Sequence, residues 1–333
     1  MRLYSQLLIA LSVLFGVACS RSHSEVQSPQ AQPAELELRL SVPFRFVAYG
    51  DTRFTDPQDT EASNPLARRT LVQAIADTHP AFISIGGDIS YNGNNVNDWK
   101  IWDRETAVWR EAKIPIYPAL GNHDLHGNQQ VALANYFARF PDLKDSRYYS
   151  VRAANMLMLV VDSSLEEVSG RQGQWLAAKL DDVPKEVGFI FVVLHHPPYT
   201  SSSDEKKYGG GHSARTQEQM LAKMLESRQK NMHARIVVFA GHVHNYERHE
   251  HGGITYFVTG GGGAHPYPIE RAPDDPFRDK NINYHYLLAE VDHNRLKVTM
   301  NRLDLSTGRV AWTRPDETTI LTPQPVMAGE ASR

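Results

Sequence analysis

Cysteine is almost absent from this chain, which contains only Cys19 among its 333 residues. No disulfide can form within the chain, and a zinc site built on thiolates is excluded as well. An excess of charge is also missing, because 35 lysines and arginines stand against 38 aspartates and glutamates. This balance gives no evidence of nucleic-acid binding, and no internal repeat is visible.

A long hydrophobic run is missing too. The longest apolar stretch, Leu7 to Ala18, is too short to span a membrane as a stable helix. It follows a positive charge at Arg2, and this order predicts a secretory signal over residues 1–19. With Cys19 directly after the stretch, the segment resembles the lipid-attachment box of bacterial lipoproteins, although Gly16 stands where that box usually has leucine. We therefore expect an exported protein of the periplasm, outer membrane or cell surface, attached through lipidated Cys19, with ordinary signal cleavage as the alternative.

The composition divides the rest of the chain into three parts. Residues 20–33 are rich in Ser, Gln and Pro, and we predict a disordered linker over 20–43. A catalytic domain is expected over 44–313, and a C-terminal tail without chemical function over 314–333.

Five predicted strands share one feature: each ends in a glycine or a sharp turn, and a metal-binding type of residue follows. The runs are Phe44–Tyr49 before Asp51, Ala81–Ile83 before Asp88, Ile114–Leu120 before Asn122, Gly188–Leu194 before His195, and Arg235–Ala240 before His242 and His244. Strands and helices alternate early, and antiparallel strands follow late. The pattern predicts an α/β (α+β) fold, a four-layer αββα sandwich of two mixed sheets flanked by helices.

Such a fold would gather seven donors at one place, because chemistry in open α/β sheets collects at the carboxyl ends of strands. The number exceeds what one metal ion needs and suits two ions about 3.5 Å apart that share a bridging carboxylate. Nitrogen and oxygen donors without sulfur favour Fe, Zn or Mn. The expected donors are Asp51, Asp88, Tyr91, Asn122, His195, His242 and His244.

Histidines outside this series are taken as ordinary surface or core residues. They are His79, His126, His233, His249, His251, His265, His285 and His293.

As an ordered set, these motifs resemble those of the calcineurin-like metallophosphoesterases, and most closely the purple acid phosphatase branch. The resemblance covers about residues 44 to 305 and implies a fold of the metallo-dependent phosphatase type. It is carried by Gly50-Asp51, Gly87-Asp88-Ile89-Ser90-Tyr91, Gly121-Asn122-His123-Asp124, His195-His196-Pro197-Pro198-Tyr199 and Gly241-His242-Val243-His244-Asn245-Tyr246-Glu247-Arg248.

The resemblance implies two metal ions, Fe(III) and a divalent Fe, Zn or Mn. The first would be held by Asp51, Asp88, Tyr91 and His244, and the second by Asn122, His195, His242 and the bridging Asp88.

Arg53 departs from the wider superfamily, which has a metal-binding histidine at this place. Arginine cannot ligate a metal, so its role stays open between phosphate binding and a structural ion pair. Asp124 is expected to orient His123.

The activity implied is that of a phosphomonoesterase that acts on a phosphorylated small molecule. The metals would lower the pKa of a bound water from about 15.7 toward 7, so that a metal-bound hydroxide attacks the phosphorus. His212 is the first candidate for the general acid, and His123 and His196 are the next. Two alternatives remain: a phosphodiesterase with the same site, acting on cyclic nucleotides or phospholipid headgroups, and a non-catalytic surface lipoprotein.

Two further readings are disfavoured. No His-x-His-x-Asp-His sequence occurs, which argues against a metallo-β-lactamase type of hydrolase. The run Gly260–Gly263 lacks the Lys-Ser/Thr that completes a P-loop, so close packing near the metal site explains it better.

Overall fold

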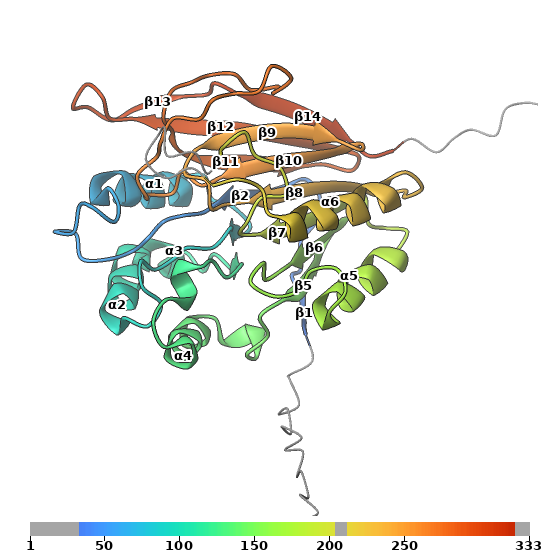
Figure 1. Ribbon diagram of the computed structural model, residues 1–333, viewed down its shortest axis with the longest axis horizontal. Helices are drawn as coiled ribbons and strands as arrows, with labels where there is room; N and C mark the ends of the chain where they lie inside the picture. The colour runs from blue at the N-terminus through green and yellow to red at the C-terminus, as the bar shows by residue number, and fades with distance from the viewer. Residues whose placement is uncertain (1–32, 204–211, 324–333) are drawn as a thin grey trace, which may run out of the picture. The chain divides into compact units, whose positions relative to one another are not determined.

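The computed structural model describes residues 33–203 and 212–323. The predicted signal, Cys19 and most of the predicted linker lie outside these residues, as does part of the loop before His212. Among the described residues, two seven-stranded mixed sheets pack face to face (Figure 1). None of the described helices is long and apolar enough to cross a membrane.

The first sheet combines parallel and antiparallel pairs, with β7 and β8 parallel at its centre. In spatial order its strands are β1 (Ala34–Glu37), β5 (Tyr149–Ala153), β6 (Met156–Val160), β7 (Phe189–Leu194), β8 (Arg235–Ala240), β10 (Ile254–Thr259) and β9 (Tyr246–His251).

The second sheet holds three parallel neighbours, followed by antiparallel strands toward its other edge. Its strands are β4 (Ile116–Pro118), β3 (Ile83–Ile85), β2 (Phe44–Tyr49), β11 (Tyr284–Val291), β12 (Arg295–Asp304) and β13 (Ala311–Thr313), with β14 (Glu317–Leu321) also paired to β12.

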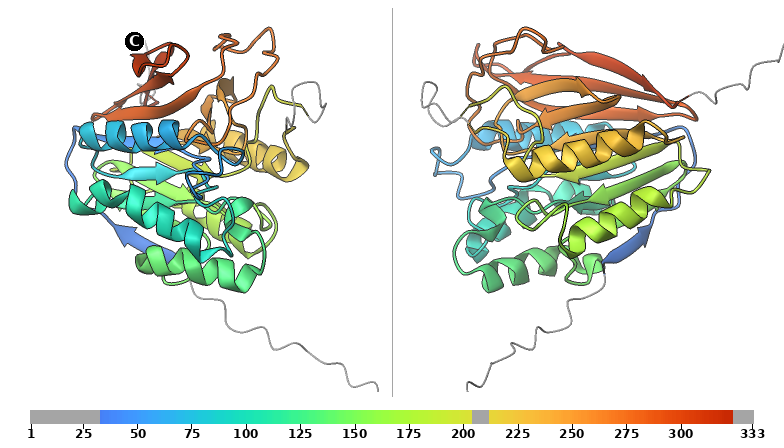
Figure 2. Two further views of the ribbon diagram at one scale, coloured as in Figure 1. Left: turned by 90° about the vertical axis from the view of Figure 1, so that its left-hand side faces the viewer. Right: turned by 45° about the vertical axis from the view of Figure 1, so that its right-hand side comes forward.

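Helices cover the outer faces of both sheets, which confirms the predicted αββα sandwich. Figure 2 shows α5 and α6 side by side along the first sheet, whereas α1 packs on the second sheet at β11. The described α-helices are α1 (Pro65–Asp77), α2 (Val96–Glu105), α3 (Ala107–Glu111), α4 (Gln129–Arg139), α5 (Arg171–Asp181) and α6 (Thr216–Gln229).

Alternation of side chains along the strands creates the layers. Phe191 of β7 points between the sheets, where its ring centroid lies 5.0 Å from that of Phe46 on β2. Its neighbours Ile190 and Val192 face the other way and pack with Leu221 of α6. Because both faces of β7 are buried, its sequence is wholly apolar, and each such side chain contributes about 1.5–3 kcal/mol through burial.

Two predicted boundaries were wrong. Residues 34–43 are not linker, because β1 pairs in parallel with β5, and residues 317–321 are not tail, because β14 pairs with β12. The helical segment over residues 96–111 is divided into α2 and α3 at Thr106, whose hydroxyl donates to the carbonyl of Trp102 at 2.7 Å. Side-chain bonds of this kind compete with regular helix geometry.

Candidate metal centre

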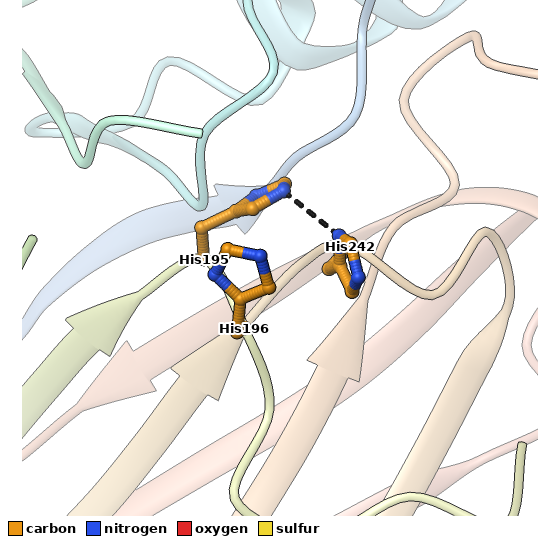
Figure 3. A group of neighbouring side chains, drawn as sticks. All are labelled: His195, His196 and His242. Carbon is orange, nitrogen blue, oxygen red and sulfur yellow. Dashed lines mark hydrogen bonds between the residues drawn. The ribbon is translucent and has the colours of Figure 1, made fainter. Parts of the chain in front are cut away.

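The carboxyl ends of five parallel strands meet between the two sheets. β2, β3 and β4 belong to the second sheet, while β7 and β8 belong to the first. Hydrogen bonds from backbone N–H groups join the loops after them: the Asp51 N–H donates to the Gly87 carbonyl at 3.0 Å, and the His242 N–H donates to the Asp51 side chain at Oδ2, 2.9 Å away. Figure 3 shows His195, His196 and His242 facing one another beyond β7 and β8.

Several donors are held in a backbone conformation that is unfavourable for their residue type. The φ angles are +59° at Asp51, +52° at Asp88 and +69° at His242, and neighbouring Arg53 has +46°. A non-glycine residue in this region costs of order 1–3 kcal/mol, and such strain persists where the surroundings over-determine it. The fold therefore holds these side chains in directions that relaxed strands would not give.

Glycines allow the carboxylates of Asp51 and Asp88 to lie against the backbone. A Cβ on Gly121 would lie 2.3 Å from Asp88 Oδ1, and a Cβ on Gly260 would lie 2.9 Å from Asp51 Oδ2 and 2.2 Å from the Val243 carbonyl oxygen. No real Cβ tolerates such distances. The close packing expected for Gly260–Gly263 is confirmed at Gly260.

The first group of donors consists of Asp51 and His244. His244 Nδ1 lies 3.0 Å from the carbonyl oxygen of His265, so we assign the proton to Nδ1 and a lone pair to Nε2. Nε2 lies 3.6 Å from Asp51 Oδ1, and both atoms are buried without a hydrogen-bond partner among the described residues. Buried polar atoms are normally paired, and a cation bound by both would satisfy them.

The second group of donors surrounds His195, and here too lone pairs face one another. Its Nδ1 lies 2.8 Å from the Gly86 carbonyl oxygen, so Nε2 carries the lone pair. That nitrogen lies 3.0 Å from Asn122 Oδ1, 3.2 Å from His242 Nδ1 and 3.4 Å from Asp88 Oδ1. Oxygens that only accept hydrogen bonds thus face a nitrogen without a proton, as in a site built for a cation.

Asp88 connects the two groups. Its Oδ1 accepts from the His123 backbone N–H at 2.9 Å on the His195 side, and its Oδ2 lies 3.4 Å from Arg53 Nη2. Ligand atoms of Asp51, Asp88 and His195 lie within 4.8 Å of one another. This is the central place that a bridging carboxylate requires.

The protonation states suit metal binding. Burial lowers the pKa of the imidazoles of His195, His242 and His244, to about 3 for His244. They are neutral at pH 7, the form that ligates metals. Burial and the charge of Asp88 raise the pKa of Asp51. For Asp88, burial acts in the same direction, but His195, His123 and Arg53 outweigh it and lower the pKa. A bound cation would stabilise both carboxylates in their charged forms.

The side chains of Asp51, Asp88, Asn122, His195, His242 and His244 form the donor ring. Tyr91 is linked to this ring through His123 and is 36% exposed. Its ring stacks on that of His123 with the centroids 5.4 Å apart, and His123 Nδ1 donates to the Tyr91 carbonyl oxygen at 2.7 Å. Burial lowers the pKa of His123 to about 4. The structure thus brings Tyr91 and His123 together beside Asp88.

The other two histidines expected to act as acids lie next to His242. The ring centroid of His212 is 4.2 Å from that of His242, and the centroid of His196 is 4.3 Å away. His196 Nδ1 is hydrogen-bonded to Ser163 Oγ at 2.7 Å. Ligand atoms of His195, His196 and His242 also lie within 4.8 Å of one another, so His196 is a candidate metal ligand as well as a candidate acid. Nothing in the sequence indicated Ser163.

The role expected of Asp124 was wrong. Its Oδ1 accepts from the backbone N–H groups of Ile89 at 2.9 Å and Ser90 at 3.0 Å, and its Oδ2 accepts from Gly121 at 2.9 Å. Because both oxygens are engaged with backbone, Asp124 ties the Asp88 loop to the Asn122 loop instead of orienting His123.

A buried network holds Thr200 and Ser201, which follow β7 in the chain. His249 lies between two carboxylates, 3.1 Å from Glu247 Oε2 and 3.3 Å from Asp275 Oδ1. Glu247 accepts from Thr200 Oγ1 at 2.6 Å and the Ser201 N–H at 2.6 Å, while Ser201 Oγ donates to Asp275 at 2.5 Å. His249 is thus a structural core residue, as expected. Glu247 and His249 are two residues apart on β9 and therefore lie on the same face of the strand. This spacing was a sequence signal for a buried polar face.

The fold and the convergent donors define a metallophosphoesterase. Residues 44–246, more than half of the chain, match the calcineurin-like phosphoesterases, and the chain belongs to that family. Members typically bind two metal ions. A comparison with curated proteins gave no match.

Solved structures share the fold at low sequence identity. A purple acid phosphatase from yellow lupin seeds is 18% identical with a TM-score of 0.65, and the match covers 85% of this chain and 54% of that one. A dimetal phosphatase from Danio rerio is 15% identical (TM-score 0.54, 84% and 99% covered). GAP50, the anchor in the inner membrane complex of Plasmodium, is 16% identical (TM-score 0.57, 85% and 90% covered). The chain spans about half the length of the lupin enzyme.

Proposed function

We propose that this protein is a dinuclear-metal hydrolase of phosphate esters, and specifically a phosphomonoesterase of the purple acid phosphatase type. The observation that carries the proposal is the pair of donor groups whose lone pairs face one another, with Asp88 between them. A hydrogen-bonded core would have supplied donors to these atoms. The match in fold to a dimetal phosphatase supports the same conclusion.

The residues fit two ions. Asp51, Tyr91 and His244 would hold one, and Asn122, His195 and His242 the other, with Asp88 shared. When bound, the ions supply Lewis acidity toward the phosphoryl oxygens and toward the attacking water.

The chain's own residues hold the metal-binding side chains in position and supply the proton for the leaving group. The Gly86 carbonyl fixes the tautomer and ring orientation of His195, and the His265 carbonyl does the same for His244. Fixed donors of this kind need no reorganisation during the reaction. His212, whose ring contacts that of His242, would protonate the leaving oxygen.

Metal analysis with a panel of esters tests the function. We expect about two ions per chain, one of them iron, and faster turnover of p-nitrophenyl phosphate than of bis(p-nitrophenyl) phosphate. Preference for the diester would instead establish the phosphodiesterase alternative. Full metal occupancy without turnover of either ester would favour a binding protein.

His212→Ala tests the proposed general acid. We expect kcat to fall by about 10²-fold for alkyl phosphates, whose alkoxide must be protonated, and by much less for p-nitrophenyl phosphate. The measurement is kcat across a series of leaving groups, with His233→Ala as a control, because His233 bonds to the Pro184 carbonyl away from the donor ring. An equal loss for all leaving groups would show that His212 does not act as the acid.

We also propose export and attachment to a membrane through lipidated Cys19. The apolar stretch before Cys19 supports this. Metabolic labelling with a palmitate analogue tests this proposal: the wild type should be labelled and Cys19→Ser should not. If the wild type is not labelled, ordinary signal cleavage is the remaining explanation.

A further inference from the structure

Among the described residues, Arg53 is the one permanently charged cation that contacts the donor ring. Its backbone is held rigidly despite its positive φ: its N–H donates to the Asp88 carbonyl at 2.9 Å, and its own carbonyl accepts from Ser63 Oγ at 3.1 Å and Arg68 Nη1 at 3.3 Å. The start of the side chain is therefore fixed relative to the Asp88 loop.

The guanidinium group is aimed at Asp88 but is not saturated by it. The contact between Nη2 and Asp88 Oδ2 measures 3.4 Å, well beyond the roughly 2.7–2.9 Å of a strong charge-assisted bond. The Nε–H is buried and has no hydrogen-bond partner among the described residues. The side chain as a whole is 18% exposed, so part of it is open to a ligand.

Arg53 is less fully paired than Arg68, whose Nη1 donates to the Arg53 carbonyl. Arg68 donates from Nε and Nη2 to Glu105 at 2.8 and 3.1 Å and is fully buried. Arg53 combines a rigid backbone, an unused N–H and a position beside the candidate reaction site.

We propose that Arg53 binds the non-bridging oxygens of the substrate's phosphoryl group and selects dianionic monoesters over monoanionic diesters. The proposal rests on the proposed function. The planar fork of arginine matches two phosphate oxygens. A monoester carries nearly two negative charges near neutral pH, because its second pKa is about 6, whereas a diester carries one. A diester also has one phosphoryl oxygen fewer to offer the fork.

The test compares Arg53→Gln, which removes the charge at similar length, with Arg53→Lys, which keeps the charge without the fork. For Arg53→Gln we expect kcat/KM for p-nitrophenyl phosphate to fall by about 10²-fold, and for bis(p-nitrophenyl) phosphate by less than about tenfold. Arg53→Lys should lie between wild type and Arg53→Gln. Arg139→Gln is the matched control, because Arg139 is 15% exposed and pairs with Asp103 away from the ring. It should leave the ratio of the two activities unchanged.

Calorimetric titration with inorganic phosphate gives a second readout that does not depend on turnover. The affinity of the metal-loaded protein should fall about tenfold or more in Arg53→Gln, with unchanged metal content. Equal losses for both esters with wild-type phosphate affinity would overturn the proposal and leave Arg53 as a structural partner of Asp88. Loss of metal in Arg53→Gln would overturn it as well. If the wild type hydrolyses neither ester, the proposed function fails, and the phosphate titration still decides whether Arg53 binds the anion.

Discussion

Asp88→Asn is expected to abolish binding of at least one metal ion and to lower kcat/KM by about 10³-fold or more. Asp88 lies between the two donor groups, within reach of His195 on one side and Arg53 on the other. Asparagine has a similar shape but offers one neutral oxygen instead of two that share a negative charge. Elemental analysis of the purified variant, together with its kinetics, provides the measurement.

Asp98→Asn is the matched control for Asp88→Asn. Asp98 is also buried, but it bonds to Thr55, Asn92 and Asn95 and not to the donor ring. We expect this variant to lose about 1–3 kcal/mol of stability and to keep its metal. Two ions and wild-type activity in Asp88→Asn would refute the bridging role.

Tyr91→Phe is expected to remove the colour of the protein. If the purple acid phosphatase assignment is right, the iron-loaded wild type is violet to pink, because a phenolate bound to Fe(III) has a charge-transfer band in the visible range. A trivalent cation favours the phenolate although the pKa of free tyrosine is about 10. The absorption spectrum at full iron occupancy measures the effect.

Tyr267→Phe distinguishes Tyr91 from the other tyrosine beside the donor ring. The ring centroid of Tyr267 lies 5.5 Å from that of His244, and burial raises the pKa of its hydroxyl, which disfavours a phenolate. This variant should keep the wild-type band. A colourless wild type with full iron would exclude the purple acid phosphatase branch but not a zinc or manganese phosphoesterase.

Much of the site could be predicted because its signal is local. A buried strand must be apolar, and a glycine after it permits the sharp turn that presents the next side chain, as for Asp51 after β2 and His242 after β8. These rules act over a few residues, so each motif can be recognised from the neighbouring letters. Their order along the chain then indicated the family.

The errors have a different origin. β1 pairs with β5 more than 110 residues further along the chain, and no short-range pattern predicts such a pairing. Asp124 was expected to bond to the side chain next to it, but its carboxylate accepts from backbone N–H groups of its own loop and of the Asp88 loop. Its partners depend on which loops the two sheets bring together.

The amino-acid sequence by itself determined which residues can bind metal and the class of fold, because residue type and hydrophobic periodicity are properties of each short segment. Only the tertiary structure decided which lone pairs face one another, as at His244 and Asp51, and where the charge of Arg53 lies. Hydrogen bonds and electrostatic interactions depend on distances of a few ångströms, and the packing of the two sheets sets those distances between residues far apart in the chain.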